Sequence, residues 1–229
     1  MINITAMMSP RTPRRNIGRP RQVAGVDARE RLLDAALTLF AERGIAGTTI
    51  AEIAARVGVT PAMVHYYFSN RDRLLDAVAA ERLSPTVNAV WSPVSETQEV
   101  VPMLRGLVQR ILKATEVNPW LPSLWLREIV SEGGQLRGRL LKLMRFENVR
   151  HLIGAVAGAQ RRGELIPELE PRLVLVSVIG LTLLPLATLR MWQTLPLLQG
   201  VGREDIARHA EALLVSAFSK PPRRRAKSA

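Results

Sequence analysis

Residues 49–75 constrain the fold more than any other part of the chain. They hold two short amphipathic helical patterns on either side of Gly58, a residue that can take the left-handed conformation that ends a helix. Thr49 and Glu52 have the spacing of a capping box, and Thr60, followed by proline, suits the start of the second helix. Two short helices joined by a glycine turn, with a third helix after them, predict a helix-turn-helix unit.

The second helix of this unit, residues 61–68, is expected to turn Val64 and Phe68 into a core, because both point the same way at the helical period. A helix this short needs such docking to be stable. The outward face is thin enough to enter a major groove, and it has no Arg, Lys, Asn or Gln. We therefore predict that bases are read by Ala62 and Met63 against thymine methyls and by the Tyr66 hydroxyl.

The stretch from about residue 27 to residue 75 resembles the TetR/AcrR family of bacterial transcriptional repressors. The resemblance is carried by LLDAALTLFAERGIAGTTIAEIA and VGVTPAMVHYYFSNRDRLL, in which the helices and the glycine turn are in register. One departure is His65, where the family usually has tyrosine. The resemblance implies that Thr60, Ala62, Met63 and Tyr66 face bases. It implies phosphate contacts for Thr48, Thr49, His65, Tyr67 and Arg71. The alternative, a helix trio that serves only for packing, stays open.

The net charge of +12 is concentrated at the ends of the chain. Residues 1–25 contain five arginines and no acid, residues 220–229 contain five Lys or Arg and no acid, and the helix-turn-helix unit is nearly neutral. We expect residues 1–26 and 220–229 to be disordered and the tails to supply much of the attraction to DNA. By resemblance, Arg19 and Arg21 belong to an arm that reaches into the minor groove. A merely solvated tail is the alternative.

The composition also excludes several kinds of chemistry. There is no cysteine, and the three histidines are scattered, so we expect no disulfide, thiolate chemistry or metal site. The N-terminal segment lacks the apolar region of a signal peptide, which favours a cytoplasmic protein. No G-x-S-x-G, H-E-x-x-H or glycine-rich loop after a strand is present, so we expect neither an enzyme nor a cofactor.

A domain boundary is expected near residue 85, because Ser84–Pro85 and the proline after Trp91 interrupt the helical pattern. This gives a DNA-binding domain over residues 27–84 and a second domain over residues 85–219. No stretch alternates as a strand does, so the fold class is all-α. Besides the helix-turn-helix pair, helices are predicted over residues 27–43 (capped by Asp27 and Glu30), 69–83 (capped by Ser69), 96–117, 119–131, 135–162, 170–198 and 204–218.

The helix over residues 170–198 contains an uncharged run from Leu173 to Leu189. The run is at the short limit for a membrane span and includes polar residues and Pro185, so a buried helix is the better interpretation and no membrane partner is expected. The resemblance implies that this helix and the last one form a four-helix bundle with a second subunit, making the protein a homodimer.

The resemblance further implies that the second domain binds a small effector. Met103, Trp120, Trp125, Met144 and Asn148 are candidates for an adaptable apolar pocket wall with a few polar groups, although plain core packing is an open alternative. The expected function is a repressor that binds a near-palindromic operator in double-stranded DNA and is released by a small apolar effector. The alternatives are an effector-independent DNA-binding protein and a co-regulator whose helix-turn-helix packs against protein.

Overall fold

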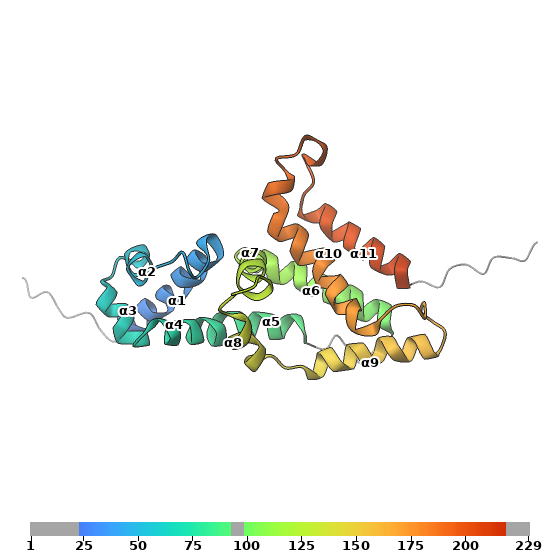
Figure 1. The fold of residues 1–229 in the computed structure, drawn as a ribbon, viewed down its shortest axis with the longest axis horizontal. Helices are drawn as coiled ribbons and strands as arrows, with labels where there is room; N and C mark the ends of the chain where they lie inside the picture. The colour runs from blue at the N-terminus through green and yellow to red at the C-terminus, as the bar shows by residue number, and fades with distance from the viewer. Residues whose placement is uncertain (1–22, 93–98, 219–229) are drawn as a thin grey trace, which may run out of the picture.

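The computed structural model describes residues 23–92 and 99–218, and over these residues every regular element is a helix, which confirms the predicted all-α fold. Helices α1 to α4 form an N-terminal unit at one end of an elongated molecule, and α5 to α11 form a C-terminal unit (Figure 1). The elements are α1 (Val23–Arg43), α2 (Ile50–Val57), α3 (Pro61–Phe68), α4 (Arg71–Val78), the π-helix η1 (Ala79–Leu83), α5 (Ser84–Val90), α6 (Val100–Val117), α7 (Leu121–Leu124), the π-helix η2 (Trp125–Val130), α8 (Arg137–Leu143), α9 (Glu147–Arg161), α10 (Pro171–Trp192), the 3₁₀ helix η3 (Pro196–Leu198) and α11 (Arg203–Phe218).

Helix α1 supports the other helices of the N-terminal unit. Its predicted apolar stripe is buried, as expected from the helical spacing of these residues. The stripe consists of Leu32, Leu33, Ala36, Leu39 and Phe40. The predicted start of α1 is wrong: the helix begins at Val23, so Asp27 lies inside it and pairs with Arg31 at 3.8 Å instead of capping the helix.

The predicted start and end of α2 are confirmed. The Thr49 side chain accepts a hydrogen bond from the backbone N–H of Glu52, and the Glu52 carboxylate accepts one from the Thr49 N–H, which completes the capping box. The helix ends at Gly58, whose φ of 77° lies in the left-handed region that glycine adopts without strain. These two local signals fix the angle at which the chain enters α3.

Helix α3 has the predicted bounds, but the cap of α4 differs from the prediction. Thr60 occupies the N-cap position of α3 without a side-chain hydrogen bond. Asn70, not Ser69, caps α4: its Oδ1 accepts a hydrogen bond from the backbone N–H of Arg73 at 2.9 Å. Ser69 instead takes a positive φ of 61° in the turn between the two helices.

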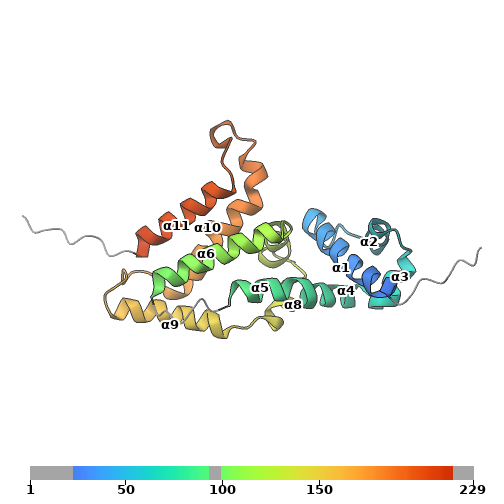
Figure 2. The same cartoon turned by 180° about the vertical axis from the view of Figure 1, so that it is seen from behind.

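The expected helix break at Ser84–Pro85 is wrong, because α4, η1 and α5 run on as one continuous helical segment from Arg71 to Val90. The π-turn explains how proline is accommodated. The Ser84 N–H bonds to the carbonyl of Ala79, five residues back. Pro85 has no N–H to donate to the Glu81 carbonyl, four residues back. That carbonyl instead accepts a hydrogen bond from the Arg82 guanidinium at 3.4 Å. The segment physically links the two units (Figures 1 and 2).

The long helix predicted over residues 135–162 is also wrong, because the chain leaves the helical conformation at Met144, where ψ is 139°. Two helices, α8 and α9, replace it. The Asn88 side chain of α5 satisfies backbone groups at the break: it donates to the Leu143 carbonyl at 3.3 Å and accepts from the Arg145 N–H at 3.1 Å. This tertiary contact compensates for the lost helical hydrogen bonds.

Helix α10 ends at Trp192, short of the predicted residue 198, and most of its apolar surface is not covered within one chain. Only 28% of its most apolar 18-residue window is buried, so the expectation of a buried helix is not met by a single chain. By length and composition this is the one helix in the described part of the chain that could cross a membrane. The predicted last helix is confirmed as α11, and the predicted helix over residues 119–131 is present as α7 and η2.

Candidate nucleic-acid interface

The outward face of α3 is the candidate reading surface. Val64 and Phe68 are buried at 1% and 4% exposure, and they fix the helix on the core as predicted. On the opposite side Tyr66 is 78% exposed, which is unusual for so large an aromatic residue in a folded domain. Ala62 and His65 are exposed as well, and Met63 and Tyr67 are half-buried.

The two tyrosines support one another. The rings of Tyr66 and Tyr67 meet edge to face with their centroids 5.1 Å apart, an arrangement favoured by their quadrupoles. The contact limits the positions of the Tyr66 ring while leaving its hydroxyl at the surface. His65 is committed locally, since its Nδ1 lies 3.1 Å from the Ser69 carbonyl oxygen. The Nε2 atom of His65 is therefore the ring nitrogen left for a phosphate.

Of the residues at the start of α2, the structure places Thr49 at the surface and Thr48 inside. Thr48 is 1% exposed, and its hydroxyl donates to the Gly44 carbonyl at 2.8 Å. The expected phosphate contact of the Thr48 side chain is therefore wrong, because the hydroxyl is buried and already bonded. Thr49 is exposed but bound to Glu52, and its backbone N–H, 2.8 Å from that carboxylate, holds the pKa of Glu52 below its usual value.

Arg71 has a structural role that sequence analysis missed. Its guanidinium donates from Nη1 to the Thr48 carbonyl at 2.7 Å and from Nη2 to the Ile45 carbonyl. These bonds join the start of α4 to the turn between α1 and α2. Each terminal nitrogen carries a second N–H, and the phosphate contact expected for Arg71 stays a prediction that rests on these remaining donors. Nothing in the local sequence marks a partner 23 residues away.

The other arginines of the N-terminal unit are also paired within the fold. Arg29 forms a bidentate pair with Glu81 at 2.6 and 2.7 Å, which lowers the pKa of Glu81. Arg82 donates to Glu30 and Asp34 across the same junction between α1 and η1. Such pairing supports the expectation that attraction to DNA relies on the terminal segments. The arm residues Arg19 and Arg21 lie outside the described residues.

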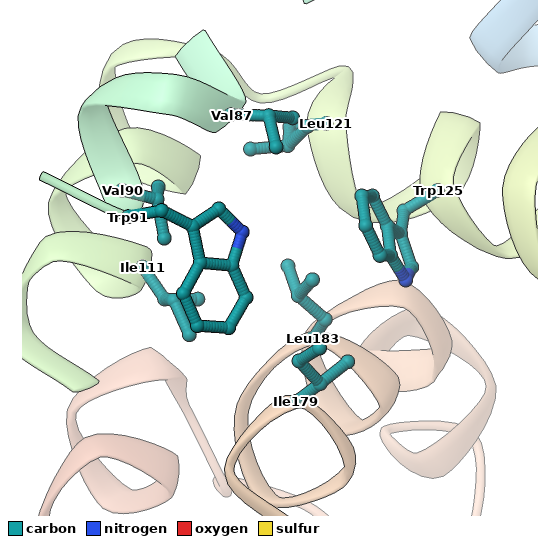
Figure 3. Close-up of a pocket in the computed structure, with 8 residues that line it drawn as sticks. All are labelled: Val87, Val90, Trp91, Ile111, Leu121, Trp125, Ile179 and Leu183. Atoms are coloured by element: carbon teal, nitrogen blue, oxygen red, sulfur yellow. The ribbon is translucent and has the colours of Figure 1, made fainter. Parts of the chain in front are cut away.

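The candidate effector residues are not gathered in one place. An apolar cavity with about 20 Å³ of free space lies in the C-terminal unit, between the Trp91 and Trp125 rings, with Ile179 and Leu183 of α10 beside them (Figure 3). Of the five candidates, Trp125 alone lines this cavity. Val87, Val90, Ile111 and Leu121 complete the wall. These aliphatic residues could not be recognised from the sequence because they follow the ordinary core pattern of their helices.

The other four candidates lie elsewhere. Trp120 lines an open groove of about 1000 Å³ between the N-terminal unit and α10. Met103, Met144 and Asn148 are half-buried and line neither hollow. The break between α8 and α9 places Met144 at the end of α8 and Asn148 in the first turn of α9.

A surface-exposed helix held on a three-helix core by a glycine turn defines a helix-turn-helix protein of the DNA-binding class. Residues 32–78 match the family model described as bacterial regulatory proteins, tetR family. This part of the chain is therefore similar to the helix-turn-helix domains of tetR-family transcriptional regulators.

Curated relatives match less than half of the chain. The chain is 30% identical over 91 residues to the nicotine-responsive transcriptional repressor HdnoR of Paenarthrobacter nicotinovorans, covering 40% of this chain and 45% of that protein. It is 43% identical over 98 residues to the transcriptional regulator BetI of Brucella melitensis, covering 43% of this chain and 50% of that protein. The chain thus spans about half the length of the curated relatives it matches.

The solved structures extend the likeness of fold to most of the chain. A transcriptional regulator from Streptomyces coelicolor superposes with a TM-score of 0.62 at 19% identity, over 85% of this chain and 99% of that one. FadR of Bacillus subtilis, solved in complex with stearoyl-CoA, superposes with a TM-score of 0.61 at 19% identity, over 82% and 98%. At this identity the likeness describes the fold.

Proposed function

We propose that the chain is a cytoplasmic transcriptional repressor that binds a near-palindromic operator as a homodimer and leaves it when a small apolar effector binds. The observation that carries the proposal is the two-sided character of α3. One side is buried through Val64 and Phe68, and the other presents the exposed Tyr66 with Ala62 and Met63. A face of this kind has no evident use in the packing of a single chain and suits a major groove.

A selection from random duplex DNA with the purified full chain tests this function. Duplexes retained through several rounds should converge on two similar half-sites in inverted orientation, about one helical turn apart, because a two-fold dimer repeats its contacts at that spacing. Retention of duplexes with no shared sequence would contradict the proposal and favour an unspecific DNA-binding protein.

The predicted mode of base reading is tested by Met63→Ala. Removing the apolar side chain should relax the preference for thymine at one position in each half-site, at a cost of up to about 1–3 kcal/mol, the range for one mismatched base pair. Repeating the selection with this variant measures the preference. Met144→Ala, a half-buried methionine outside the N-terminal unit, is the matched control. Unchanged preferences at every position in the Met63→Ala selection would rule out this contact.

The exposed apolar surface of α10 supports the homodimer. Leu173, Val176, Leu184 and Met191 are between 51% and 61% exposed and lie on one face at helical spacing. Gly180 lies on the same face, and a Cβ added there would meet no atom within 4 Å. A small residue within an apolar face lets a partner helix approach closely. A second copy of α10, related by a two-fold axis, would cover this apolar face, and the apolar faces of both copies would be buried against each other.

The small apolar cavity between Trp91 and Trp125 supports an effector that is small and apolar. Its wall presents eight residues with apolar side chains, apart from the indole N–H groups, and the free space holds about one water molecule. An effector must therefore open the site by moving side chains, and it favours a second conformation only by binding that conformation more tightly. The relatives HdnoR, which is nicotine-responsive, and FadR, in complex with stearoyl-CoA, add plausibility to a regulator that responds to a small molecule.

A further inference from the structure

The junction between the N-terminal and C-terminal units is built around Glu128, a side chain of η2 that is only 6% exposed. Its Oε1 accepts a hydrogen bond from the backbone N–H of Ile45 at 2.8 Å, and its Oε2 accepts one from the N–H of Gln135 at 3.1 Å. Ile45 belongs to the turn between α1 and α2, whereas Gln135 follows η2 in the C-terminal unit. One carboxylate thus joins the backbones of both units.

The chain packs closely against the Glu128 backbone on one side and against its carboxylate on the other. A Cβ at Gly134 would lie 2.4 Å from the Glu128 carbonyl oxygen, so no other residue fits at this position without movement of the backbone. On the opposite side a Cβ at Gly44 would lie 3.4 Å from Oε1, and the φ of Gly44 is 77°. A buried carboxylate is costly unless its hydrogen bonds are satisfied, and here two backbone donors satisfy it.

The same π-turn touches the apolar cavity. Trp125 is the first residue of η2, and its ring lines the cavity opposite Trp91 (Figure 3). The six residues from Trp125 to Val130 separate the cavity from the α1–α2 turn, and α7, which runs directly into η2, packs on α1 (Figures 1 and 2). π-Turns are frequent at functional sites, where the extra residue changes the direction of a side chain. Trp125 and Glu128 are three residues apart in the same π-helix, within one helical turn.

The chain of contacts continues from Ile45 into the helix-turn-helix unit. Ile45 is fully buried, and its carbonyl is held by Arg71 of α4. The second Arg71 bond goes to the Thr48 carbonyl, immediately before the cap of α2. The Glu128 carboxylate therefore binds the N–H of a residue whose carbonyl is bonded to Arg71 of α4, and Arg71 also binds the Thr48 carbonyl just before α2.

We propose that Glu128 is a positioning residue that transmits the state of the cavity to the helix-turn-helix unit through its hydrogen bond to Ile45. When an apolar occupant displaces Trp125, the hydrogen bond from the Ile45 N–H to Glu128 lengthens or breaks, and the helix-turn-helix unit changes its orientation. The inference rests on the proposed function, because it concerns the path by which an effector would release DNA.

A double-mutant cycle on the full chain tests the path without knowledge of the effector. Ile179→Phe places extra apolar volume in the cavity and stands in for an occupant. Glu128→Gln keeps the size of the side chain but turns an NH₂ group toward one of the two backbone donors. The readout is the backbone N–H of Ile45, followed by NMR chemical shift and hydrogen exchange in the wild type, both single variants and the double variant.

We expect Ile179→Phe to shift the Ile45 N–H signal and speed its exchange in the wild-type background, and to have no such effect in the Glu128→Gln background. In parallel, Ile179→Phe should weaken binding to the selected operator by about 5-fold to 150-fold, the usual range of allosteric coupling. In the Glu128→Gln background the same change should alter affinity by no more than about twofold, the limit for independent sites. Thermal melting of each variant identifies a loss of global stability, which alone would not produce this coupling.

Glu132→Gln, which changes an exposed glutamate in the turn after η2, is the matched control and should leave the response to Ile179→Phe intact. The proposal is overturned if the Ile45 N–H does not respond to Ile179→Phe, or responds equally with and without Glu128. The proposed function is tested separately. If the chain binds no duplex specifically, the proposed function is wrong, and the Ile45 measurement still shows whether the cavity and the helix-turn-helix unit are coupled through Glu128.

Discussion

Leu184→Arg is expected to make the full chain monomeric and to abolish tight operator binding. Leu184 is 51% exposed at the middle of the apolar face of α10, beside Gly180. At a two-fold interface the substitution places two unpaired guanidinium groups near each other, and each buried charge without a partner costs about 3–5 kcal/mol. One such penalty already raises the dissociation constant of the dimer by about a hundredfold or more.

Sedimentation velocity at micromolar concentration measures the predicted change in mass, and fluorescence anisotropy with the selected operator measures its effect on DNA binding. Leu141→Arg on α8 is the matched control, since Leu141 is similarly exposed at 47% but lies away from α10. It should remain dimeric and bind DNA normally. A Leu184→Arg protein that is still dimeric would show that another surface forms the dimer, and that the apolar face of α10 has a different use.

Phe68→Ala is expected to destabilise the N-terminal unit strongly. Phe68 is 4% exposed at the end of α3, and the Arg29 guanidinium carbon lies 5.2 Å from the centre of its ring. Truncation removes both contacts and leaves a cavity, at an expected cost of about 3–5 kcal/mol. Because domains are stable by only about 5–15 kcal/mol, α3 should lose its fixed position and operator binding should fail.

Urea unfolding followed by two signals locates the damage. All four tryptophans follow residue 90, so their fluorescence reports the C-terminal unit, whereas circular dichroism reports the helices of the whole chain. In Phe68→Ala the circular dichroism should show an early transition that tryptophan fluorescence does not. Phe68→Leu, which keeps most of the volume, should cost less than about 1.5 kcal/mol. Equal stability of Phe68→Ala and the wild type would contradict the role of Phe68 in holding α3.

The parts of the fold that depend on neighbouring residues could be predicted from the sequence. The capping box of Thr49 with Glu52, the left-handed Gly58 and the bounds of α3 follow from local hydrogen bonds and periodicity, and all are present. The breaks that depend on tertiary contacts could not. The apolar period continues through Met144, but the Asn88 side chain, more than 50 residues away, stabilises the break between α8 and α9.

The candidate site, too, could be predicted from the sequence only in part. Exposure of Tyr66 and burial of Val64 follow from the helical period, so the outward face of α3 could be predicted. The role of Arg71 could not, because its partners are backbone carbonyls that any residue would supply. The cavity wall was missed for a related reason: aliphatic residues that line a hollow have the same sequence pattern as those that fill a core.

We expect paired α3 helices to give this chain specific affinity for one DNA sequence. This expectation is tested most directly by titrating the full chain against the selected operator and a scrambled duplex of equal length, at increasing salt, with the stoichiometry measured in the same samples. We expect two chains per operator and an affinity for the operator at least about a thousandfold above that for the scrambled duplex at physiological salt. Equal affinities that fall together as salt rises, with one chain bound, would contradict the claim.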